Sequence, residues 1–409
     1  MMLNKCRCCG NEKLKSVISL GESPLANNLS ERITQEDQTY PLEMMYCEEC
    51  HNCQLSCVVP PEKLFENYLY VSSTAKSFRD HFENAAIHYI EKFSLNENSL
   101  VVDIGSNDGI SLRPLKDRGI KILGVDPAVN VAKIANDSGI ETLNSYFDTE
   151  AANTILEKYG KADIVTASNV FAHSDFVKEI ANDAFRILKT EGAFIVEVQY
   201  LLDTIKDLTF DNIYHEHVNY WSVTSIKNMF EKLGYEVFHV EHVDTHGGSI
   251  RVYVQNPQAR EIEESVNLFL EEEKNFGLQD FSTYEEFAKR ILREKHNVNQ
   301  NFKMMKDRGM RIVGYGSPAK ATTALNFFET GTQYLDFIVE DNSLKHGKFL
   351  PTLKIPILPK AALSKVAPDV VVIMAWNFAA EIVKNNQDLV ERGIKFVSIK
   401  DLGRENFEI

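Results

Sequence analysis

The sequence predicts an α/β protein in which a doubly wound parallel sheet is flanked by a small N-terminal metal-binding unit and a C-terminal α/β unit. Three observations predict this fold class. All seven cysteines lie before residue 58, strands and helices alternate from residue 99 onward, and a second such series begins at residue 311. Such alternation is typical of parallel sheets covered by helices. The 409 residues are too many for one core and agree with two to four domains.

The N-terminal cysteines have the spacing of a structural zinc site. Two C-x2-C pairs, separated by 37 residues, supply four thiolates for a tetrahedral ion, whereas disulfides are disfavoured in a reducing cytosol. The predicted ligands of this closed site, which has no catalytic position, are Cys6, Cys9, Cys47 and Cys50. By spacing, Cys8 and Cys53 compete for these places. Cys53 and Cys57 fit a strand as small core residues, and buried free thiols are the alternative for the whole cluster.

The central unit begins with a helical connector and a buried strand that ends in a glycine turn. The connector is expected at 75–92 and the strand at 99–105. Further strands are expected at 121–126, 163–167 and 192–198, and helices at 129–137 and 176–188. Two later strands are expected at 236–241 and 249–255, and the polar-apolar alternation of the second predicts an antiparallel edge strand.

A long charged helical tract separates the central unit from the C-terminal one. It covers about 260–306 and is interrupted near Gly277. The C-terminal unit is expected to have strands at 311–316, 334–340 and 369–375, with prolines in the loops between them. The domain boundaries expected from these features are 1–75 for zinc binding, 76–300 for the central unit and 301–409 for the C-terminal unit.

The turn after the first central strand carries acids where a dinucleotide site is uncharged. Asp103 precedes the first glycine and Asp108 lies in the turn, so both would repel a diphosphate at this helix N-terminus. The ammonium group of S-adenosylmethionine fits better. Asp126, at the end of the next strand, is placed to accept hydrogen bonds from two ribose hydroxyls. This pattern of D-x-G-x-x-x-G with an acid after the second strand is similar to that of class I methyltransferases.

The predicted cofactor-binding residues are Asp103, Gly105, Asn107, Asp108, Gly109, Asp126 and Asn169. The two glycines would let the backbone approach the ligand. Asn169, after the 163–167 strand, would line the mouth where a methyl group is transferred. Two alternatives stay open, because the motif also fits an Asp-Gly turn of an unrelated α/β enzyme and Asn169 also fits a strand-end cap.

Four chemically active side chains follow one another at residues 214–217, in a loop beyond the 192–198 strand. We expect His215 and His217 to face different surroundings, which disfavours a two-histidine metal site. One imidazole as general base fits better, because histidine titrates near neutral pH. Glu216 can orient a neighbouring imidazole, and the Tyr214 hydroxyl can stabilise an oxyanion. His173, after the 163–167 strand, is expected to converge on the same cleft.

The glycine turn of the C-terminal unit has the opposite character. Residues 314–320 place a hydroxyl and a cation at a helix N-terminus, and no carboxylate lies in the turn itself. These features suit a diphosphate, so Ser317 and Lys320 are predicted to bind one. The alternative is a Rossmann-like unit that only packs.

Charge and hydropathy exclude two classes of partner. The 44 basic and 59 acidic residues give a net charge of -15, which repels polyanions, and no basic stretch offsets it. No run approaches the ~18–20 apolar residues of a membrane span, and the N-terminus lacks the apolar region of a signal peptide. We therefore expect neither nucleic acid nor membrane as partner, and a cytoplasmic location.

Taken together, the motifs resemble those of the nucleotide-sugar C-methyltransferases, which act on 4-keto deoxysugars. The resemblance spans nearly the whole chain and runs, after the cysteines, through DIGSNDG (103–109), YHEH (214–217), HGGSIR (246–251), GYGSPAKATTALN (314–326) and AWNFAAEI (375–382). It implies an N-terminal zinc-binding domain, a central S-adenosylmethionine domain with the class I methyltransferase sheet, and a C-terminal Rossmann-like domain that binds the nucleotide sugar.

The resemblance also implies roles for single residues. The catalytic histidine of the family falls on His217, with Tyr214 and Glu216 as its partners, and a further tyrosine and histidine fall on Tyr68 and His173. Tyr70 offers an equally good hydroxyl for the place of Tyr68.

The implied reaction is S-adenosylmethionine-dependent methylation at C3 of a nucleoside-diphosphate 4-keto-deoxyhexose, with dTDP as the expected carrier. His217 would remove the C3 proton to give an enolate, and the structural Zn²⁺ would take no part. The protein is expected to be a monomer or a small homo-oligomer. Alternatives are an O- or N-methyltransferase on a nucleotide sugar, an NAD-dependent sugar oxidoreductase, and a scaffold protein that uses zinc for assembly.

Overall fold

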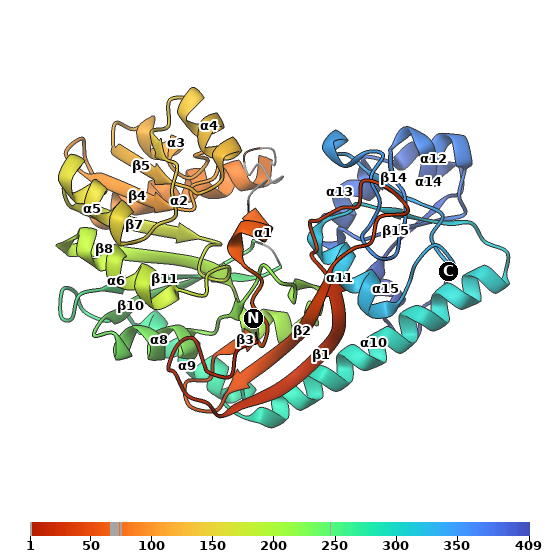
Figure 1. Ribbon diagram of the computed structural model, residues 1–409, viewed down its shortest axis with the longest axis horizontal. Coiled ribbons are helices and arrows are strands. Elements are labelled where there is room, and N and C mark those ends of the chain that lie inside the picture. The colour runs from red at the N-terminus through yellow and green to blue at the C-terminus, as the bar shows by residue number, and fades with distance from the viewer. Residues whose placement is uncertain (1, 66–72, 74–75, 246) are drawn as a thin grey trace.

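The computed structural model describes residues 2–65, 73, 76–245 and 247–409. Its strands form three sheets of four, seven and five strands. Figure 1 shows the large central sheet and the C-terminal sheet as two lobes, with the N-terminal strands and the long helix α10 (Phe281–Asp307) below and between them. The chain is therefore an α/β protein with mixed sheets, as the sequence predicts.

The N-terminal sheet is antiparallel and takes its last strand from the middle of the chain. Its order is β1-β2-β3-β9. The strands are β1 (Leu14–Pro24), β2 (Thr39–Cys47), β3 (Cys53–Leu55) and β9 (Asn219–Tyr220). The short helix α1 (Pro61–Phe65) follows β3. Because β9 directly follows the 214–217 loop, this pairing ties the N-terminal sheet to the predicted catalytic residues.

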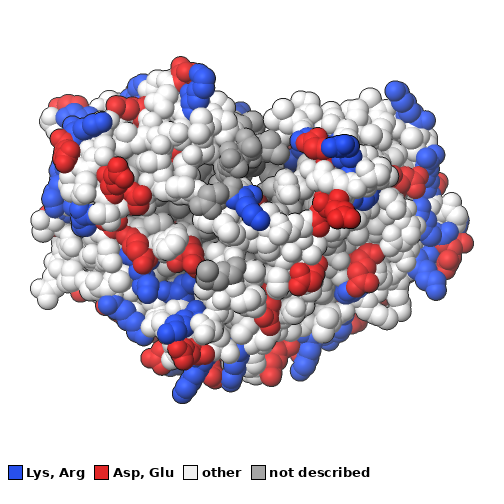
Figure 2. All heavy atoms as spheres, in the orientation of Figure 1, with Lys and Arg blue, Asp and Glu red and all other residues white. Residues whose placement is uncertain are grey.

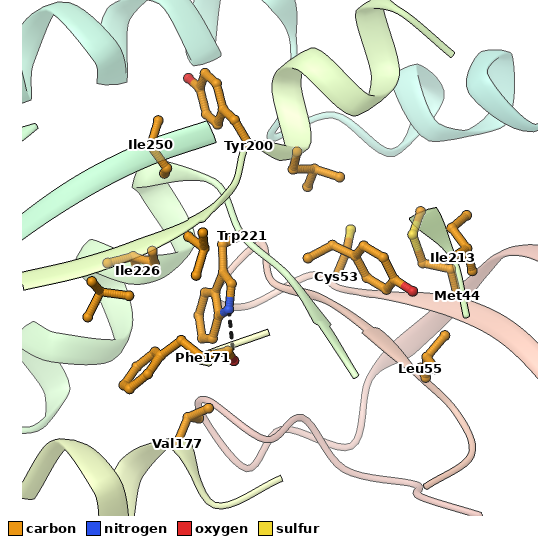
Figure 3. Packing of buried hydrophobic residues seen from close by; sticks show 14 of the residues in the cluster. Met44, Cys53, Leu55, Phe171, Val177, Tyr200, Ile213, Trp221, Ile226 and Ile250 are labelled. Atoms are coloured by element: carbon orange, nitrogen blue, oxygen red, sulfur yellow. Dashed lines mark hydrogen bonds between the residues drawn. The ribbon is translucent and has the colours of Figure 1, made fainter. Parts of the chain in front are cut away.

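The core continues from the N-terminal sheet into the central unit. Figure 3 shows Met44 and Cys53 in one cluster with Phe171 and Trp221, all of them fully buried. The indole of Trp221 donates a hydrogen bond to the Phe171 carbonyl at 3.2 Å. The N-terminal unit is therefore joined to the central unit by shared apolar packing as well as by β9.

The central sheet has the order β10-β11-β8-β7-β4-β5-β6. The five strands from β8 to β6 are parallel, and β11 and β10 continue the sheet antiparallel. The strands are β4 (Leu100–Ile104), β5 (Lys121–Val125), β6 (Thr142–Leu143), β7 (Ala162–Ser168), β8 (Leu188–Gln199), β10 (Glu236–Val243) and β11 (Ser249–Gln255). The helices are α2 (Lys76–Phe93), α3 (Arg113–Lys116), α4 (Val129–Asp137), α5 (Thr149–Lys158), α6 (Val177–Ile187), α7 (Leu201–Lys206), the 3-10 helix η2 (Phe210–Asn212) and α8 (Val223–Lys232).

The prediction that 249–255 is an edge strand is wrong. β11 lies between β10 and β8, and all seven of its residues are buried. Its polar side chains face internal partners instead of water: Arg251 forms ion pairs with Glu197 and Glu241, each at 2.8 Å. The alternation that indicates a solvent-facing edge here marks a buried charge network.

Two helices lead to the C-terminal unit. α9 (Glu264–Phe276) ends at Gly277, whose φ of 88° is left-handed and lets the chain turn into α10. The parallel sheet that follows has the order β14-β13-β12-β15-β16. Its elements are β12 (Ile312–Tyr315), α11 (Ala319–Phe328), β13 (Ile338–Glu340), η3 (Ser343–Lys345), β14 (Ile357–Pro359), α12 (Ala361–Val366), β15 (Val370–Ile373), η4 (Trp376–Phe378), α13 (Ala379–Lys384), α14 (Gln387–Glu391), β16 (Lys395–Ser398) and α15 (Ile399–Leu402).

The second strand of this unit begins four residues later than the sequence suggests. The amides of Tyr334 and Leu335 both donate to the Gly331 carbonyl, which makes this segment a turn and delays β13 until Ile338. Within the part of the chain that the structure describes, no helix is long and apolar enough to cross a membrane. Figure 2 shows acidic and basic side chains interspersed over the face that it draws.

Candidate active site

A cavity of about 2730 Å³ opens between the three units. Each unit contributes to its wall: Asn27 comes from the N-terminal unit, Gly105 and His217 from the central unit, and Lys320 and Trp376 from the C-terminal unit. The glycine turn, the histidine loop and the C-terminal turn therefore face one shared space.

The glycine turn after β4 is built from left-handed backbone and a carboxylate that receives its amides. Gly105 has a φ of 67°, and a Cβ at this position would collide with Val170 Cγ2. Asn107 is also left-handed, and its amide donates to Asp126 Oδ2 at 2.8 Å. Asp126 Oδ1 accepts from the Ala128 amide at 2.9 Å. The second-strand acid is thus held at the cavity wall by backbone amides on both sides.

Asp103 is a buried carboxyl at the floor of this turn. Burial raises the pKa of Asp103 to about 6, although hydrogen bonds from the Ser111 and Thr166 hydroxyls oppose the rise. The Asp103 carboxylate still predominates at pH 7 and lines the cavity.

Five of the seven predicted cofactor-binding residues line the cavity, namely Asp103, Gly105, Asn107, Asp126 and Asn169. Among the described residues, Asp108 and Gly109 lie outside this wall. Asp108 accepts from the Ser73 amide at 3.1 Å, and a Cβ on Gly109 would lie 2.7 Å from Ile140 Cγ2. Gly109 therefore leaves room for Ile140, and it lies outside the wall that a ligand in this cavity would contact.

The cavity wall fits the chemistry of S-adenosylmethionine. The carboxylate of Asp103 suits its cationic end, and Asp126 can accept from hydroxyls with the lone pairs that its two amide donors leave. Asn169 is left-handed with a φ of 58°, and its amide donates to the Glu197 carbonyl at 2.7 Å, so it forms a fixed turn beside Gly105.

The histidine loop holds one imidazole in a defined tautomer. His217 Nδ1 lies 2.9 Å from the Asn212 carbonyl, and His217 Nε2 lies 2.9 Å from the Tyr214 hydroxyl. A carbonyl oxygen can only accept, so Nδ1 carries the proton and Nε2 of the neutral ring has the lone pair. His217 is thus arranged as a proton acceptor at Nε2, in contact with a hydroxyl that also lines the cavity.

A second imidazole lies beside the first. The ring centroids of His173 and His217 are 4.8 Å apart in an edge-to-face arrangement. Burial lowers the pKa of His173 to about 4, against the opposing effect of a hydrogen bond to the Glu216 backbone. His173 is therefore neutral at pH 7 and places no positive charge next to the proton acceptor.

The remaining two residues of the loop point to different surroundings. His215 turns toward the N-terminal sheet, with Nε2 3.3 Å from the Pro41 carbonyl. Glu216 faces the cavity and accepts from Asn27 Nδ2 at 2.6 Å. Burial raises the pKa of Glu216 to about 7, and the Asn27 hydrogen bond opposes this. Tyr68 and its alternative Tyr70 lie outside the described residues.

At the C-terminal turn the structure adds a carboxylate that the local sequence does not contain. The amide and hydroxyl of Ser317 both donate to Glu340 Oε2, at 2.8 and 2.7 Å. Lys345 donates to the Ser317 carbonyl at 2.7 Å. Lys320 lines the cavity with its ammonium 4.4 Å from the centre of the Trp376 ring. Lys320 thus faces the cavity, whereas both donors of Ser317 already have an acceptor.

The four predicted zinc ligands converge in the N-terminal unit. The Sγ atoms of Cys6, Cys9, Cys47 and Cys50 all lie within 4.8 Å of one another, with the Cys6–Cys50 and Cys9–Cys47 distances at 3.5 Å. Tetrahedral zinc with bonds of about 2.3 Å places thiolates roughly 3.8 Å apart, so the donor set fits one Zn²⁺. Cys53 and Cys57 are buried, as expected for core residues.

Some residues of the cavity were not predicted from the sequence. Asn27 is one, because its partner Glu216 is 189 residues away. Trp376 is another, and its Nε1 donates to Asp211 Oδ2 at 2.6 Å. Gly247 and Gly248 of the HGGSIR motif also line the wall. The HGGSIR motif was the feature of the sequence that pointed to these two glycines.

Comparison with known proteins finds three family models that follow one another along the chain. Family models described as a zinc binding domain, a methyltransferase domain and a C-methyltransferase C-terminal domain match residues 6–65, 78–240 and 244–399. The chain is 35% identical over 398 residues to C-methyltransferase NovU of Streptomyces niveus, an alignment that covers 97% of this chain and 95% of NovU.

Solved structures resemble part of the chain at low identity. The methyltransferase in complex with the Trm112 activator of Haloferax volcanii is 19% identical, covers 44% of this chain and 93% of its own, and has a TM-score of 0.36. Magnesium protoporphyrin IX methyltransferase of Synechocystis with bound SAH is 14% identical, with 44% and 83% coverage and a TM-score of 0.35.

Proposed function

The chain belongs to the C-methyltransferase family, and from this premise we propose that it transfers the methyl group of S-adenosylmethionine to C3 of a nucleoside-diphosphate 4-keto-deoxyhexose. The observation that carries the proposal is the geometry of His217. Its Nε2 is the basic nitrogen of a fixed tautomer, and it faces the same cavity as the glycine turn and Lys320. A C-methyltransferase needs a base that removes a proton from carbon, whereas an O-methyltransferase does not.

The glycine turn is the proposed cofactor site. When bound, S-adenosylmethionine supplies an electrophilic methyl group on a sulfonium. Asp103 would attract the cationic amino-acid end, and Asp126 would accept from ribose hydroxyls. β4 and β7 are adjacent in the sheet, and Asn169, which directly follows β7, lines the same cavity as His173.

The proposed chemistry begins with removal of the C3 proton of the sugar by His217 Nε2. The electron pair of the C–H bond moves toward the C4 ketone, giving an enolate whose oxygen needs a hydrogen-bond donor. Neutral His173 and the Tyr214 hydroxyl are the described candidates. C3 of this enolate would then be the nucleophile for the methyl group that bound S-adenosylmethionine would supply, with S-adenosylhomocysteine as the leaving group. No step involves the zinc site, because its four thiolates leave no open coordination position.

We assign the nucleotide sugar to the C-terminal side of the cavity. Lys320 is the proposed contact for the diphosphate, because its ammonium group would locally offset the repulsion between the phosphates and a protein of net charge -15. Ser317 would have to exchange Glu340 for a phosphate oxygen to take part in this contact. The preferred carrier is dTDP.

The test is a labelled methyl donor with a panel of 4-keto nucleotide sugars. We expect label on carbon of one sugar, and exchange of the C3 proton with deuterated solvent when the methyl donor is left out. His217→Ala should lower the rates of both the exchange and the methylation by about 10²–10⁴-fold. His215→Ala is the matched control and should keep both. Methylation that persists in His217→Ala, or label found on oxygen or nitrogen, would refute the proposal.

A further inference from the structure

A pair of hydrogen bonds links the C-terminal unit to the proposed base. Trp376 begins η4, just after β15, and its Nε1 donates to Asp211 Oδ2 at 2.6 Å. Asp211 lies in η2, directly before Asn212, and the Asn212 carbonyl accepts from His217 Nδ1 at 2.9 Å. Only one peptide unit separates the two hydrogen bonds, so the position of the indole is coupled to the carbonyl that sets the tautomer of His217.

The indole is held in place by its neighbours. The ammonium groups of Lys320 and Lys400 lie 4.4 and 4.3 Å from the centre of the Trp376 ring, within the range of a cation–π contact. Gly247 leaves room for the ring, since a Cβ there would lie 2.8 Å from it. A shift of the ring would therefore disturb two cations and the HGGSIR loop together.

Asp211 is a buried carboxylate that depends on the Trp376 indole as a hydrogen-bond donor. Its exposed fraction is 6%. Burial raises the pKa of Asp211 above its ordinary value. The nearby Lys320, the Trp376 hydrogen bond and Lys400 oppose this rise. Removal of the indole N–H would leave a buried acceptor without that donor, which is costly enough to make η2 rearrange.

We propose that Trp376 and Asp211 are positioning residues for the base: they fix the Asn212 carbonyl and so hold His217 with its proton on Nδ1. The inference rests on the proposed function, because it gives His217 the role of base. It adds that the C-terminal unit, besides binding substrate, completes the catalytic loop of the central unit. Lys320 contacts Trp376 and is the proposed diphosphate ligand, so substrate binding and base alignment share one cluster.

The expected effect follows from the hydrogen bond at Nδ1. An acceptor there stabilises the protonated ring and makes Nε2 more basic. Within the described part of the chain, the recorded neighbours of the His217 ring are Tyr214 on its own loop and His173 on the turn after β7, and the titratable Glu216 directly precedes it in the sequence. These stay in place when Trp376 is changed, so a fall in the pKa of His217 would report the Asn212 contact.

The experiment uses the full chain with Trp376→Phe, Asp211→Asn and the double variant. Nuclear magnetic resonance of ¹⁵N-labelled histidine gives the tautomer and pKa of His217 without any substrate. We expect a lower pKa and a mixed tautomer in both single variants. We also expect kcat to fall about tenfold or more, and the acid limb of its pH profile to move to lower pH. Affinity for S-adenosylhomocysteine should not change. The double variant should be no worse than the poorer single variant, because both act through one hydrogen bond.

Trp221→Phe is the matched control, since it removes the other indole donor of the chain from a core contact with Phe171. It should lower the melting temperature and leave the tautomer of His217 unchanged. The positioning role is overturned if Trp376→Phe and Asp211→Asn both keep the tautomer and kcat, or if their effects on kcat multiply. If the tautomer shifts but the wild-type protein methylates no 4-keto sugar, the proposed function fails and the positioning role stands.

Discussion

At the scale of single residues, the candidate site combines groups whose protonation is set by burial. Glu216 is 4% exposed, and its pKa is raised to about 7 by burial despite the Asn27 hydrogen bond. His173 is kept neutral by the same effect. About half of the Glu216 side chains therefore carry a proton at pH 7, so the charge beside His217 changes within the physiological range.

Replacement of Glu216 should change the pH dependence of stability. The folded pKa of about 7 lies above the ordinary value of 4.5, so the folded state holds this proton more tightly. Stability contributed by the protonated group is full below about pH 4.5 and is lost as the pH rises to about 7. We expect Glu216→Gln to be more stable than the wild type at pH 8, by on the order of 3 kcal/mol, and nearly equal at pH 4.5.

Urea denaturation at both pH values measures this difference. Glu43→Gln, on β2, is a suitable control, because Glu43 is only partly buried and accepts from the Ser16 hydroxyl at 2.6 Å. An equal effect of Glu216→Gln at both pH values would contradict the assignment.

At the scale of elements, the turn after β4 depends on one glycine. Gly105 needs both its left-handed backbone and the space beside Val170. We expect Gly105→Ala to cost about 1–2 kcal/mol from the backbone alone, with more from the collision, and to weaken binding of S-adenosylhomocysteine. The double variant Gly105→Ala with Val170→Ala should recover the part due to the collision. Calorimetric titration and thermal unfolding measure the two effects; an unchanged affinity would argue against this turn as the cofactor site.

Zinc should stabilise the N-terminal sheet. β2 ends at Cys47, one of four converging thiols, and β3 follows Cys50 after two residues. We expect one zinc per chain by metal analysis. Cys47→Ser or a strong chelator should lower the melting temperature of the whole chain, because the core is shared with the central unit. Cys57→Ala is the control for loss of a buried thiol outside the cluster and should keep the metal. Less than one zinc per chain would contradict the four-cysteine site.

The sequence predicts elements best where the signal is local. The buried runs of β4, β5, β7 and β8 were located within a few residues, because continuous apolar segments between turns have few other interpretations. The two-residue strands β6 and β9 were not predicted, since a pair of residues carries no periodicity. The bounds of β11 were predicted correctly, but its predicted place at the edge of the sheet was wrong, because buried ion pairs give the same alternation as a solvent-facing edge.

The same distinction holds for the site. The histidine loop and the first glycine turn could be proposed because their residues are contiguous. Glu340 at Ser317, Asn27 at Glu216 and Asp211 at Trp376 could not, because these contacts join residues between 23 and 189 positions apart. The residues of such contacts can be read from the sequence, but which residue pairs with which cannot.

At the scale of the whole molecule, the N-terminal unit also contacts the C-terminal unit. Asp37 forms an ion pair with Lys354, and its side chain is 2% exposed. Ser30 pairs with Phe349 in an isolated bridge, and Thr322 donates to the Ala26 carbonyl at 2.8 Å. The C-terminal unit is thus connected to the rest of the chain by contacts with the N-terminal unit as well as by α10.

Loss of the Lys354 ammonium should weaken this tie. Burial acts to raise the pKa of Asp37, but hydrogen bonds from Lys354, Thr352 and Ser30 outweigh it and lower the pKa. The contribution is therefore present above the ordinary value of 3.8 and is lost as the pH falls through the lower folded pKa. We expect Lys354→Met to cost about 2 kcal/mol at pH 7, less than a fully buried pair, and much less near pH 3.

Lys348→Met breaks the more exposed pair with Glu31 and is the matched control, expected to cost under about 1 kcal/mol. Denaturation at pH 7 and pH 3 would measure both variants. A Lys354→Met cost that is the same at the two pH values would contradict the role of Asp37.

The strand β9 has a consequence for how the chain is made. β3 pairs with Tyr220 and Asn219, which are translated more than 160 residues later. At about 5–20 residues per second, the edge of β3 stays open for on the order of 10–30 s during synthesis. A chain that stops before residue 219 keeps this edge permanently, and open strand edges are where nascent or truncated chains associate with one another. The unit that leaves the ribosome first is therefore among the last to be completed.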